Sequence, residues 1–197
     1  IPIAVQLLHR VDQGDEKLQR MVTLEPSDYH PGSGTLTALF NPPGFNQPGV
    51  ALSLRHLMEL MILISDNSAT DVLLREVGGP SAINARLDAL GVQGLRIDGP
   101  TKAMIEDARQ NGGHPVNRDQ STPDGMAALL LKLVKGEALK PESTDLLLDI
   151  MRRCQTGNAR LKGLLPEGTV VRHKTGTLNY TANDVGFIDL PNGAGRI

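Results

Sequence analysis

The stretch VVRHKTGTLNYTANDVGFIDL, residues 170–190, decides how the rest of the chain is interpreted. Its two halves are rich in β-branched and aromatic residues and flank a polar turn, so we predict a hairpin of strands over 169–177 and 182–190. The first strand ends in Lys-Thr-Gly-Thr. This end is either a solvated turn or a place where a flat anionic ligand reaches the backbone beside Gly176 while Lys174 binds its charge.

The composition excludes several functional classes. Of the 197 residues, 40% are hydrophobic and 21% are charged, and the net charge is -2, as is common in soluble globular chains. There is no long basic run, so we expect no nucleic-acid partner. No apolar segment reaches the roughly 18 residues of a membrane span, so none is expected. Cys154 is the only cysteine, and no HExxH pair or phosphate-binding glycine motif occurs, so we predict no disulfide, metal or cofactor.

Helical periodicity runs through most of residues 1–152. Ser53 is a suitable N-cap for a buried helix that continues to about Ile64, and Ser121 or Thr122 is a suitable N-cap for the helix that begins near residue 123. Gly14 is a suitable stop for the first helix. The predicted helices cover about 1–13, 54–64, 69–77, 80–90, 123–135, 141–154 and 159–165.

Two stretches interrupt this helical pattern. Residues 31–50 are rich in Gly, Pro and Asn and are predicted to form a loop. Residues 98–120 have little periodicity, although 101–109 can hold a helical turn or two. Loops of this length inside compact domains are usually functional or disordered.

The order of the elements predicts an α+β fold, with an all-α domain over 1–152 and part of an α/β domain over 153–197. The predicted strands are too few for a complete sheet. We therefore interpret the chain as an internal part of a longer protein that supplies further strands. We also expect residues 1–197 alone not to fold stably, because exposed strand edges favour aggregation.

A second motif, Ser65-Asp66-Asn67, lies between two predicted helices. Such residues are often simple turn and cap residues, and a lysine at a strand end is often just solvated. The alternative is a hydroxyl that relays a proton, an amide that grips a ligand, and a cation that attracts an anionic substrate. Each tripeptide arises by chance in about one chain in forty of this length, so the pair is much rarer, and SDN with KTG belongs to penicillin-reactive serine enzymes.

The chain resembles class A serine β-lactamases over nearly its whole length. The segments SDNSATDVLL, VGGPSAINARLDALG, MRRCQTGNARLKGLLPEGTVV and HKTGTLNYTANDVGFI carry the resemblance. It implies a fold of the β-lactamase and penicillin-binding-protein type, in which an all-α domain lies beside an α/β domain with an antiparallel sheet and the site lies between them.

The resemblance also implies roles for individual residues. Ser65 passes a proton to the departing β-lactam nitrogen, and Lys174 acts with it as a catalytic residue. Arg160 stands where some members carry a carboxylate-binding arginine, although a plain surface charge remains the other interpretation. The implied substrate-binding residues are Asn67, which grips the side-chain amide, and Arg160, Thr175, Gly176 and Thr177, which together with Lys174 line the carboxylate pocket.

Two features depart from the family pattern. The chain contains no SxxK, the tetrad that carries the family nucleophile, and we expect that serine and its lysine to precede Ile1. It also contains no ExxxN, whose glutamate activates the deacylating water. Gapless alignment places Thr101 at that glutamate, which leaves Glu106 as a candidate base or as half of a surface pair with Lys102.

A third departure concerns the anchor of the loop. Asp119 resembles the family's loop-anchoring aspartate, but Gly99 stands where its arginine partner is expected.

The resemblance implies a β-lactamase that hydrolyses penicillin-type antibiotics through an acyl-enzyme. The alternatives are a penicillin-binding D-alanyl-D-alanine peptidase, which the missing ExxxN favours, or a β-lactam sensor domain that deacylates slowly. A β-lactam is the expected small-molecule partner. A monomer that is periplasmic or secreted from a bacterium is expected. The substrate spectrum stays open.

Overall fold

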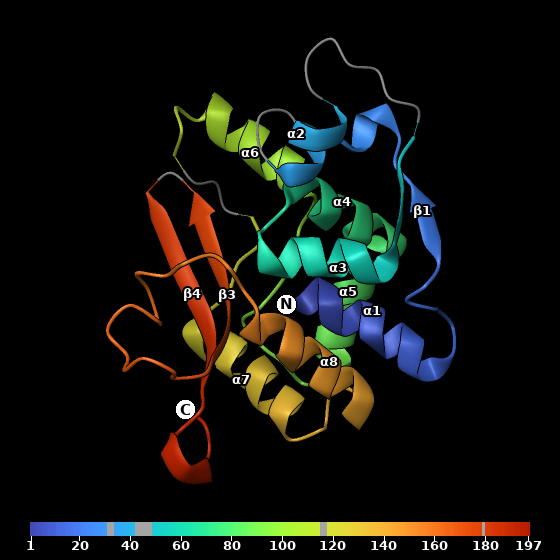
Figure 1. Ribbon diagram of the computed structural model, residues 1–197. Helices are drawn as coiled ribbons and strands as arrows, with labels where there is room; N and C mark the ends of the chain where they lie inside the picture. Colours follow the sequence, from blue (N-terminus) through green and yellow to red (C-terminus); the bar gives the residue numbers. More distant parts are fainter. Residues whose placement is uncertain (31–33, 42–48, 115–117, 179) are drawn as a thin grey trace.

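The computed structural model describes residues 1–30, 34–41, 49–114, 118–178 and 180–197. A body of helices carries a long β-ribbon along one side (Figure 1). This segregation of helices and antiparallel strands is the α+β arrangement predicted from the sequence.

A helix in the middle of the body organises the core. This helix, α3, packs against the helices on either side of it, α4 and α8, and α1 packs against α4, α5 and α8 (Figure 1). Leu54, Leu57 and Met58 of α3 are fully buried, as its apolar sequence predicted. The helices of the body are α1 (Pro2–Gln13), α3 (Leu54–Leu63), α4 (Asn67–Glu76), α5 (Gly79–Ala89), α7 (Pro123–Val134) and α8 (Pro141–Arg152).

The predicted helix ends are confirmed by their capping geometry. The Ser53 hydroxyl accepts a hydrogen bond from the backbone N–H of His56 at 3.2 Å at the start of α3. The Thr122 hydroxyl does the same for Gly125 at 3.0 Å at the start of α7. Gly14 ends α1 with a φ of 83°, which a residue with a side chain rarely adopts.

The loops contain more structure than their sequences predicted. Residues 31–50 include helix α2 (Thr35–Phe40), and residues 31–33 and 42–48 lie outside the described part. The region 98–120 contains a ten-residue helix, α6 (Thr101–Gln110), where we predicted a turn or two. A small antiparallel pair joins β1 (Met21–Thr23) to β2 (Ala51–Ser53), inside a region predicted to be helical, and η1 (Pro26–Asp28) follows β1.

One predicted helix is wrong. Residues 159–165 form successive turns. The backbone N–H of Arg160 donates to the carbonyl oxygen of Gly157 at 2.9 Å, and the backbone N–H of Gly163 donates to the carbonyl oxygen of Arg160 at 2.8 Å. These bonds span three residues rather than the four of an α-helix. The segment bonds instead to the β-ribbon beside it, as described below.

The β-ribbon matches the predicted hairpin to within about two residues, the usual uncertainty of element ends. β3 (Val171–Leu178) pairs antiparallel with β4 (Thr181–Ile188), and η2 (Pro191–Gly193) follows. Side chains alternate along β3, so that His173 and Thr175 are buried while Lys174 between them is half-buried. β3 packs on α8 at the edge of the helical body.

Within the described residues, these strands form two separate two-stranded sheets. No helix in the described ranges is long and apolar enough to cross a membrane.

Candidate active site

The Ser-Asp-Asn motif forms the tight passage between α3 and α4. Ser65 has a φ of 57°, a left-handed conformation that a non-glycine residue adopts only at a cost. Asp66 next to it is fully buried, and its two carboxylate oxygens accept from the backbone N–H groups of Ala69 and Leu36, each at 2.9 Å. The buried carboxylate therefore fixes the turn, and the turn presents the Ser65 hydroxyl.

Lys174 of β3 meets this hydroxyl. Its ammonium Nζ donates to Ser65 Oγ and also to the carbonyl oxygen of Thr175 at 2.6 Å. Burial lowers the pKa of Lys174 from its ordinary value of 10.5, and nearby Cys154 and Asp184 partly oppose this. The structure thus joins the two motifs that the sequence singled out, and it places a partly desolvated cation against a hydroxyl.

Arg160 lies at the C-terminal end of β3, and its guanidinium bridges the two strands. It donates from Nη1 to the carbonyl oxygens of Gly176 at 3.0 Å and Asn183 at 2.6 Å, and from Nη2 to the Thr177 hydroxyl at 2.7 Å. Arg160 is therefore bonded to the strand end that carries the KTG motif, and its role in binding a carboxylate stays a prediction. Together with Lys174 it makes this strand end strongly positive.

Gly176 is not required by the packing of the fold. A Cβ added there would meet its nearest atom, Asn183 Cβ, at an ordinary 3.7 Å. The residue is exposed on the strand, so a side chain would project over the surface rather than into the core. The absence of a side chain is consistent with the predicted close approach of a ligand.

Thr175 and Asn67, which were both predicted to bind the substrate, have different surroundings in the structure. Thr175 is buried, and its hydroxyl lies 2.7 Å from that of Thr156, so the hydroxyl serves a contact between segments. Asn67 is the first residue of α4 and is half-buried directly after the Ser65-Asp66 turn. Their roles in binding a substrate remain predictions.

A cavity of about 400 Å³ lies beside the strand end. Lys174, Thr175 and Gly176 of β3 line one side. The rest of its lining comes from β4, from the starts of α1 and α7, and from the two arms of the long loop 95–122, which are its two ends. These lining residues are Asn183, Val185, Ile1, Pro2, Pro123, Met126, Leu95, Arg96, Ile97, Asp119, Ser121 and Thr122.

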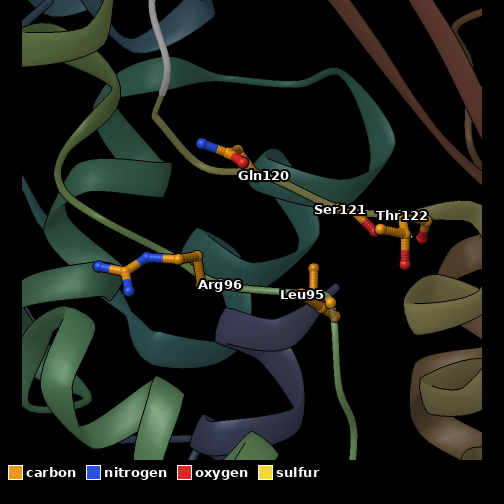
Figure 2. A pocket seen from close by; sticks show the side chains of 6 residues that line it. Leu95, Arg96, Gln120, Ser121 and Thr122 are labelled. Atoms are coloured by element: carbon orange, nitrogen blue, oxygen red, sulfur yellow. Dashed lines mark hydrogen bonds between the residues drawn. The ribbon is translucent and has the colours of Figure 1, made fainter.

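The two arms of the long loop run side by side (Figure 2). Leu95 pairs with Ser121, and the backbone N–H of Arg96 donates to the carbonyl oxygen of Gln120 at 2.9 Å. The Arg96 side chain points away from Ser121 and Thr122 in this view. The pairing holds the two ends of the loop together beside the cavity.

Asp119 anchors this base without an arginine. Its carboxylate accepts from the backbone N–H groups of Asp98 at 2.6 Å and Gly99 at 3.4 Å, and the Asp98 carboxylate accepts from the Asp119 N–H at 3.1 Å. Burial raises the pKa of Asp119. The anchoring function that we inferred for this aspartate is therefore carried out by backbone amides.

Helix α6 forms the middle of the loop and is capped from another helix. Asp71 of α4 accepts from the backbone N–H groups of Thr101 at 2.6 Å and Lys102 at 3.0 Å. None of the residues of α6 is fully buried, so this carboxylate is the principal tie between the start of the helix and the body. α4 thus carries the Ser-Asp-Asn motif at its first turn and holds the loop helix further along.

The acids of α6 are engaged by arginines. Glu106 accepts from Arg109 at 2.7 and 2.9 Å and from Gln110 at 2.8 Å, which lowers its pKa to about 2. Asp107 pairs with Arg118 at 2.5 Å. A carboxylate with so low a pKa is a weak base at neutral pH. The expected alternative, a pair between Glu106 and Lys102, is not formed, since Lys102 lies near the Ser27 carbonyl at 3.5 Å.

Sequence reasoning missed three residues behind the site. Thr156 bonds to Thr175, and the buried side chain of His173 pairs with Asp184 across the ribbon. The period-2 pattern of β3 already placed His173 and Thr175 on one face. Thr156 could not be inferred, because its place depends on how the segment after α8 folds back, whereas Asp184 follows from the register of the hairpin, which sets it opposite Thr175. Among the described residues, no group of three His, Cys, Asp or Glu side chains could hold a metal ion.

Comparison with known proteins shows the relatives of this chain. The model of the β-lactamase enzyme family matches residues 1–196. The chain is 31% identical to the β-lactamase VEB-1 of Pseudomonas aeruginosa over 98% of its own length and 64% of that protein. It is also 31% identical to the extended-spectrum β-lactamase PER-1 of the same organism, over 97% of its length and 61% of that protein.

Solved structures share the fold. A β-lactamase from Chitinophaga pinensis superposes with a TM-score of 0.86 at 28% identity, over 99% of this chain and 70% of that chain. The structure of PBP-A superposes with a TM-score of 0.81 at 33% identity, over 99% and 66%. The architecture is therefore the predicted β-lactamase and penicillin-binding-protein fold.

The chain spans 64% of the length of VEB-1 and 61% of the length of PER-1. Within that span the match is continuous, and it includes the two motifs that meet at Lys174 and Ser65. On this evidence the chain belongs to the β-lactamase enzyme family.

Proposed function

We propose that the whole protein, meaning the complete natural polypeptide that contains residues 1–197, is a class A serine β-lactamase. The observation that carries the proposal is the hydrogen bond from Lys174 to Ser65, which unites the KTG and SDN motifs beside a cavity. The substrate is a penicillin-type β-lactam, and no metal or cofactor takes part. Such an activity confers antibiotic resistance in the periplasm or outside the cell, with the protein acting as a monomer.

In the proposed reaction a serine hydroxyl attacks the lactam carbonyl carbon, and the carbon–nitrogen bond breaks to give an acyl-enzyme. Relatives of this family supply that serine from SxxK, and residues 1–197 contain no such tetrad. We propose that the nucleophilic serine comes from the part of the whole protein before Ile1. Ile1 itself lines the cavity beside Lys174, so that part is close to the site.

Ser65 is proposed to deliver a proton to the lactam nitrogen as that nitrogen departs. Its hydroxyl oxygen accepts a hydrogen bond from the Lys174 ammonium, and its own proton remains available for transfer to a neighbouring group. Lys174 in a desolvated position also stabilises the negative charge that develops during the attack.

The substrate carboxylate is proposed to bind at the end of β3. Arg160, Lys174 and the Thr177 hydroxyl provide charge and donors there, and Gly176 leaves the backbone open. Thr175 contributes its backbone to the same wall, and Asn67 is proposed to bind the amide of the substrate side chain.

Release of the acyl group requires an activated water. The residues available for activating it favour a second candidate function. The sequence has no ExxxN, and Glu106 and Asp107 are each held by arginines. A slow deacylating relative, either a D-alanyl-D-alanine peptidase or a β-lactam sensor, would share the acylation machinery and lack the base.

Rapid mixing of the whole protein with a chromogenic β-lactam separates these functions. A β-lactamase gives acylation followed by steady turnover. A stoichiometric burst without turnover identifies the peptidase or sensor, and the absence of both overturns the proposal. We expect Glu106→Gln to leave the turnover rate unchanged, because Glu106 faces Arg109 and Gln110.

A further inference from the structure

A buried carboxylate behind the site links three segments of the chain. The imidazole Nδ1 of His173 lies 2.8 and 2.9 Å from the two carboxylate oxygens of Asp184 in β4. Its Oδ2 also accepts from the backbone N–H of Leu161 at 3.3 Å. The His173 side chain is 0% exposed and that of Asp184 is 5% exposed, so water does not compete for these bonds.

Leu161 directly follows Arg160 in the irregular segment between α8 and β3. This segment lies tightly against the ribbon, since a Cβ on Gly157 would come within 2.4 Å of Thr175 Cγ2 and 3.4 Å of Asp184 Oδ2. It has no helix of its own to fix its backbone. Its position therefore depends on its ties to the ribbon. Besides the hydrogen bonds of the Arg160 guanidinium, these ties include the Thr156–Thr175 hydroxyl pair and the bond from Leu161 to Asp184.

We propose that Asp184 is a positioning residue for Arg160. By holding the Leu161 amide, it sets the backbone from which the guanidinium reaches Thr177 and the carbonyl oxygens of Gly176 and Asn183. The two contacts from His173 Nδ1 orient the carboxylate toward Leu161. This inference rests on the proposed function, because it assigns the pair a part in binding the substrate carboxylate.

The pair is not placed to act on the substrate directly. The second imidazole nitrogen, His173 Nε2, is buried and has no hydrogen-bond partner among the residues that the structure describes. Neither His173 nor Asp184 lines the cavity beside Lys174. Asp184 also raises the pKa of Lys174 through its charge, and that effect is retained in a variant that keeps the carboxylate. The proposed positional influence passes through the backbone of Leu161 and the side chain of Arg160.

The first test is Asp184→Asn in the whole protein. The substitution removes the charge and replaces one acceptor oxygen by an NH2 donor, so a single neutral oxygen has to serve both His173 and Leu161 and the bond to Leu161 weakens. We expect KM for benzylpenicillin to rise about tenfold, the size of one displaced charge-assisted hydrogen bond. KM for the methyl ester of benzylpenicillin, which lacks the carboxylate, and kcat for both stay within about twofold. Equal increases in both KM values overturn the proposal.

Asp189→Asn is a matched control. Asp189 also binds a side chain of β3, since its carboxylate accepts from Arg172 Nη2 at 2.6 Å, but it lies at the far end of the same ribbon. We expect a comparable loss of thermal stability and an unchanged KM. A selective rise in KM for benzylpenicillin in this variant as well overturns the specific role of Asp184.

Two further variants separate position from charge. Asp184→Glu retains the negative charge but moves the carboxylate by one methylene, so it is not expected to restore KM, and full rescue overturns positioning. It also carries the test if the Asn variant does not fold. Adding Asp184→Asn to Arg160→Ala is expected to raise KM no further, whereas an additive rise means that Asp184 acts without Arg160.

Amide hydrogen exchange at Leu161 tests the inference independently of catalysis. Exchange speeds up in Asp184→Asn and stays unchanged in Asp189→Asn, and a protected Leu161 in the Asn variant overturns the proposal. If the whole protein fails to react with β-lactams, the proposed function fails while this measurement still decides whether Asp184 holds the segment.

Discussion

Ser65 keeps a side chain where glycine would be conformationally easier. Its φ of 57° follows directly on the end of α3, the position at which helices commonly end in glycine. The hydroxyl contacts Lys174, so the strain coincides with the junction of the two motifs. Strained residues that persist at such a junction are expected where function requires the side chain.

This strain gives a prediction for two variants of the whole protein. Ser65→Ala and Ser65→Gly both remove the hydroxyl, so we expect the same large loss of acylation rate. Ser65→Gly relieves the backbone strain and should exceed Ser65→Ala in unfolding free energy by about 1 kcal/mol. Chemical denaturation and single-turnover kinetics measure the two effects. An alanine variant as stable as the glycine variant contradicts the argument from strain.

Lys174 predicts a pH dependence. Burial lowers its pKa from 10.5, so the folded protein loses this proton at a lower pH than the unfolded chain. Between the two pKa values the unfolded chain binds more protons, and the unfolding free energy rises with pH. Over the same window the loss of the cation lowers kcat/KM for a carboxylate substrate.

The measurement is a pH profile of kcat/KM and of stability for the whole protein and for Lys174→Arg. Arginine stays charged beyond about pH 12, so the alkaline fall in kcat/KM below pH 10.5 should be absent in that variant. A fall that remains in Lys174→Arg must come from another group.

At the scale of the β-ribbon, two glycines have opposite roles. A Cβ on Gly186 would lie 2.0 Å from the carbonyl oxygen of Arg172 and 2.6 Å from His173 Cα, so the strand pair leaves no room for it. A Cβ on Gly176 meets only ordinary contacts. One glycine is therefore required by the fold, while the other is free to serve a ligand.

We predict that Gly186→Ala lowers the unfolding free energy by about 1–3 kcal/mol or more, as overpacking against rigid backbone does. Gly176→Ala should change stability by no more than about 0.5 kcal/mol, as surface substitutions do, and still weaken substrate binding. Thermal melts and KM measurements of the two variants decide this. Equal destabilisation by both substitutions would remove the case for a ligand at Gly176.

Aspartates cap two helices from across the fold. Asp71 caps α6, and Asp12 of α1 accepts from the backbone N–H of Lys140 at 2.7 Å and from the Ser143 hydroxyl at 2.6 Å at the start of α8. Neither helix has a side-chain cap of its own. Helix α8 buries much of one face, whereas α6 buries no residue fully.

Removing the two caps should therefore have different consequences. Each of Asp12→Ala and Asp71→Ala is expected to cost about 0.5–2 kcal/mol of cap stabilisation. In Asp71→Ala this suffices to unfold α6 locally, so amides 103–110 lose protection while the core stays protected. In Asp12→Ala helix α8 stays helical, held by its buried face. Intact protection of α6 in Asp71→Ala contradicts the dependence on Asp71.

The elements that sequence predicted well are those whose signals are local. Ser53 and Thr122 cap their helices through hydroxyls three residues before the amides that they bind. Helix α6 was underpredicted because its cap, Asp71, comes from thirty residues earlier in the chain. The segment 159–165 has an apolar helical spacing, yet its backbone bonds to Asp184 and its arginine to the ribbon.

At the scale of the whole molecule, the site depends on contacts that no local pattern encodes. Ser65 and Lys174 are 109 residues apart, and only the family resemblance brought their motifs together in advance. The resemblance also singled out Arg160, which the structure bonds to the strand end that carries the KTG motif, while its role in binding a carboxylate stays a prediction. It could not show that backbone amides replace an arginine in anchoring Asp119, or that Glu106 is turned to Arg109.

The last prediction concerns residues 1–197 as an isolated polypeptide. The helical body buries a substantial core, but β3 and β4 form a two-stranded sheet within the described residues, and Phe187 is the only buried hydrophobic residue of β4. Two-stranded ribbons are marginally stable in water, and their free edges pair with other chains. We expect the polypeptide to aggregate on heating and the amides of 171–188 to exchange rapidly while α3 and α8 stay protected. A single cooperative thermal transition with protected ribbon amides would show that the helical body alone is enough to hold the ribbon.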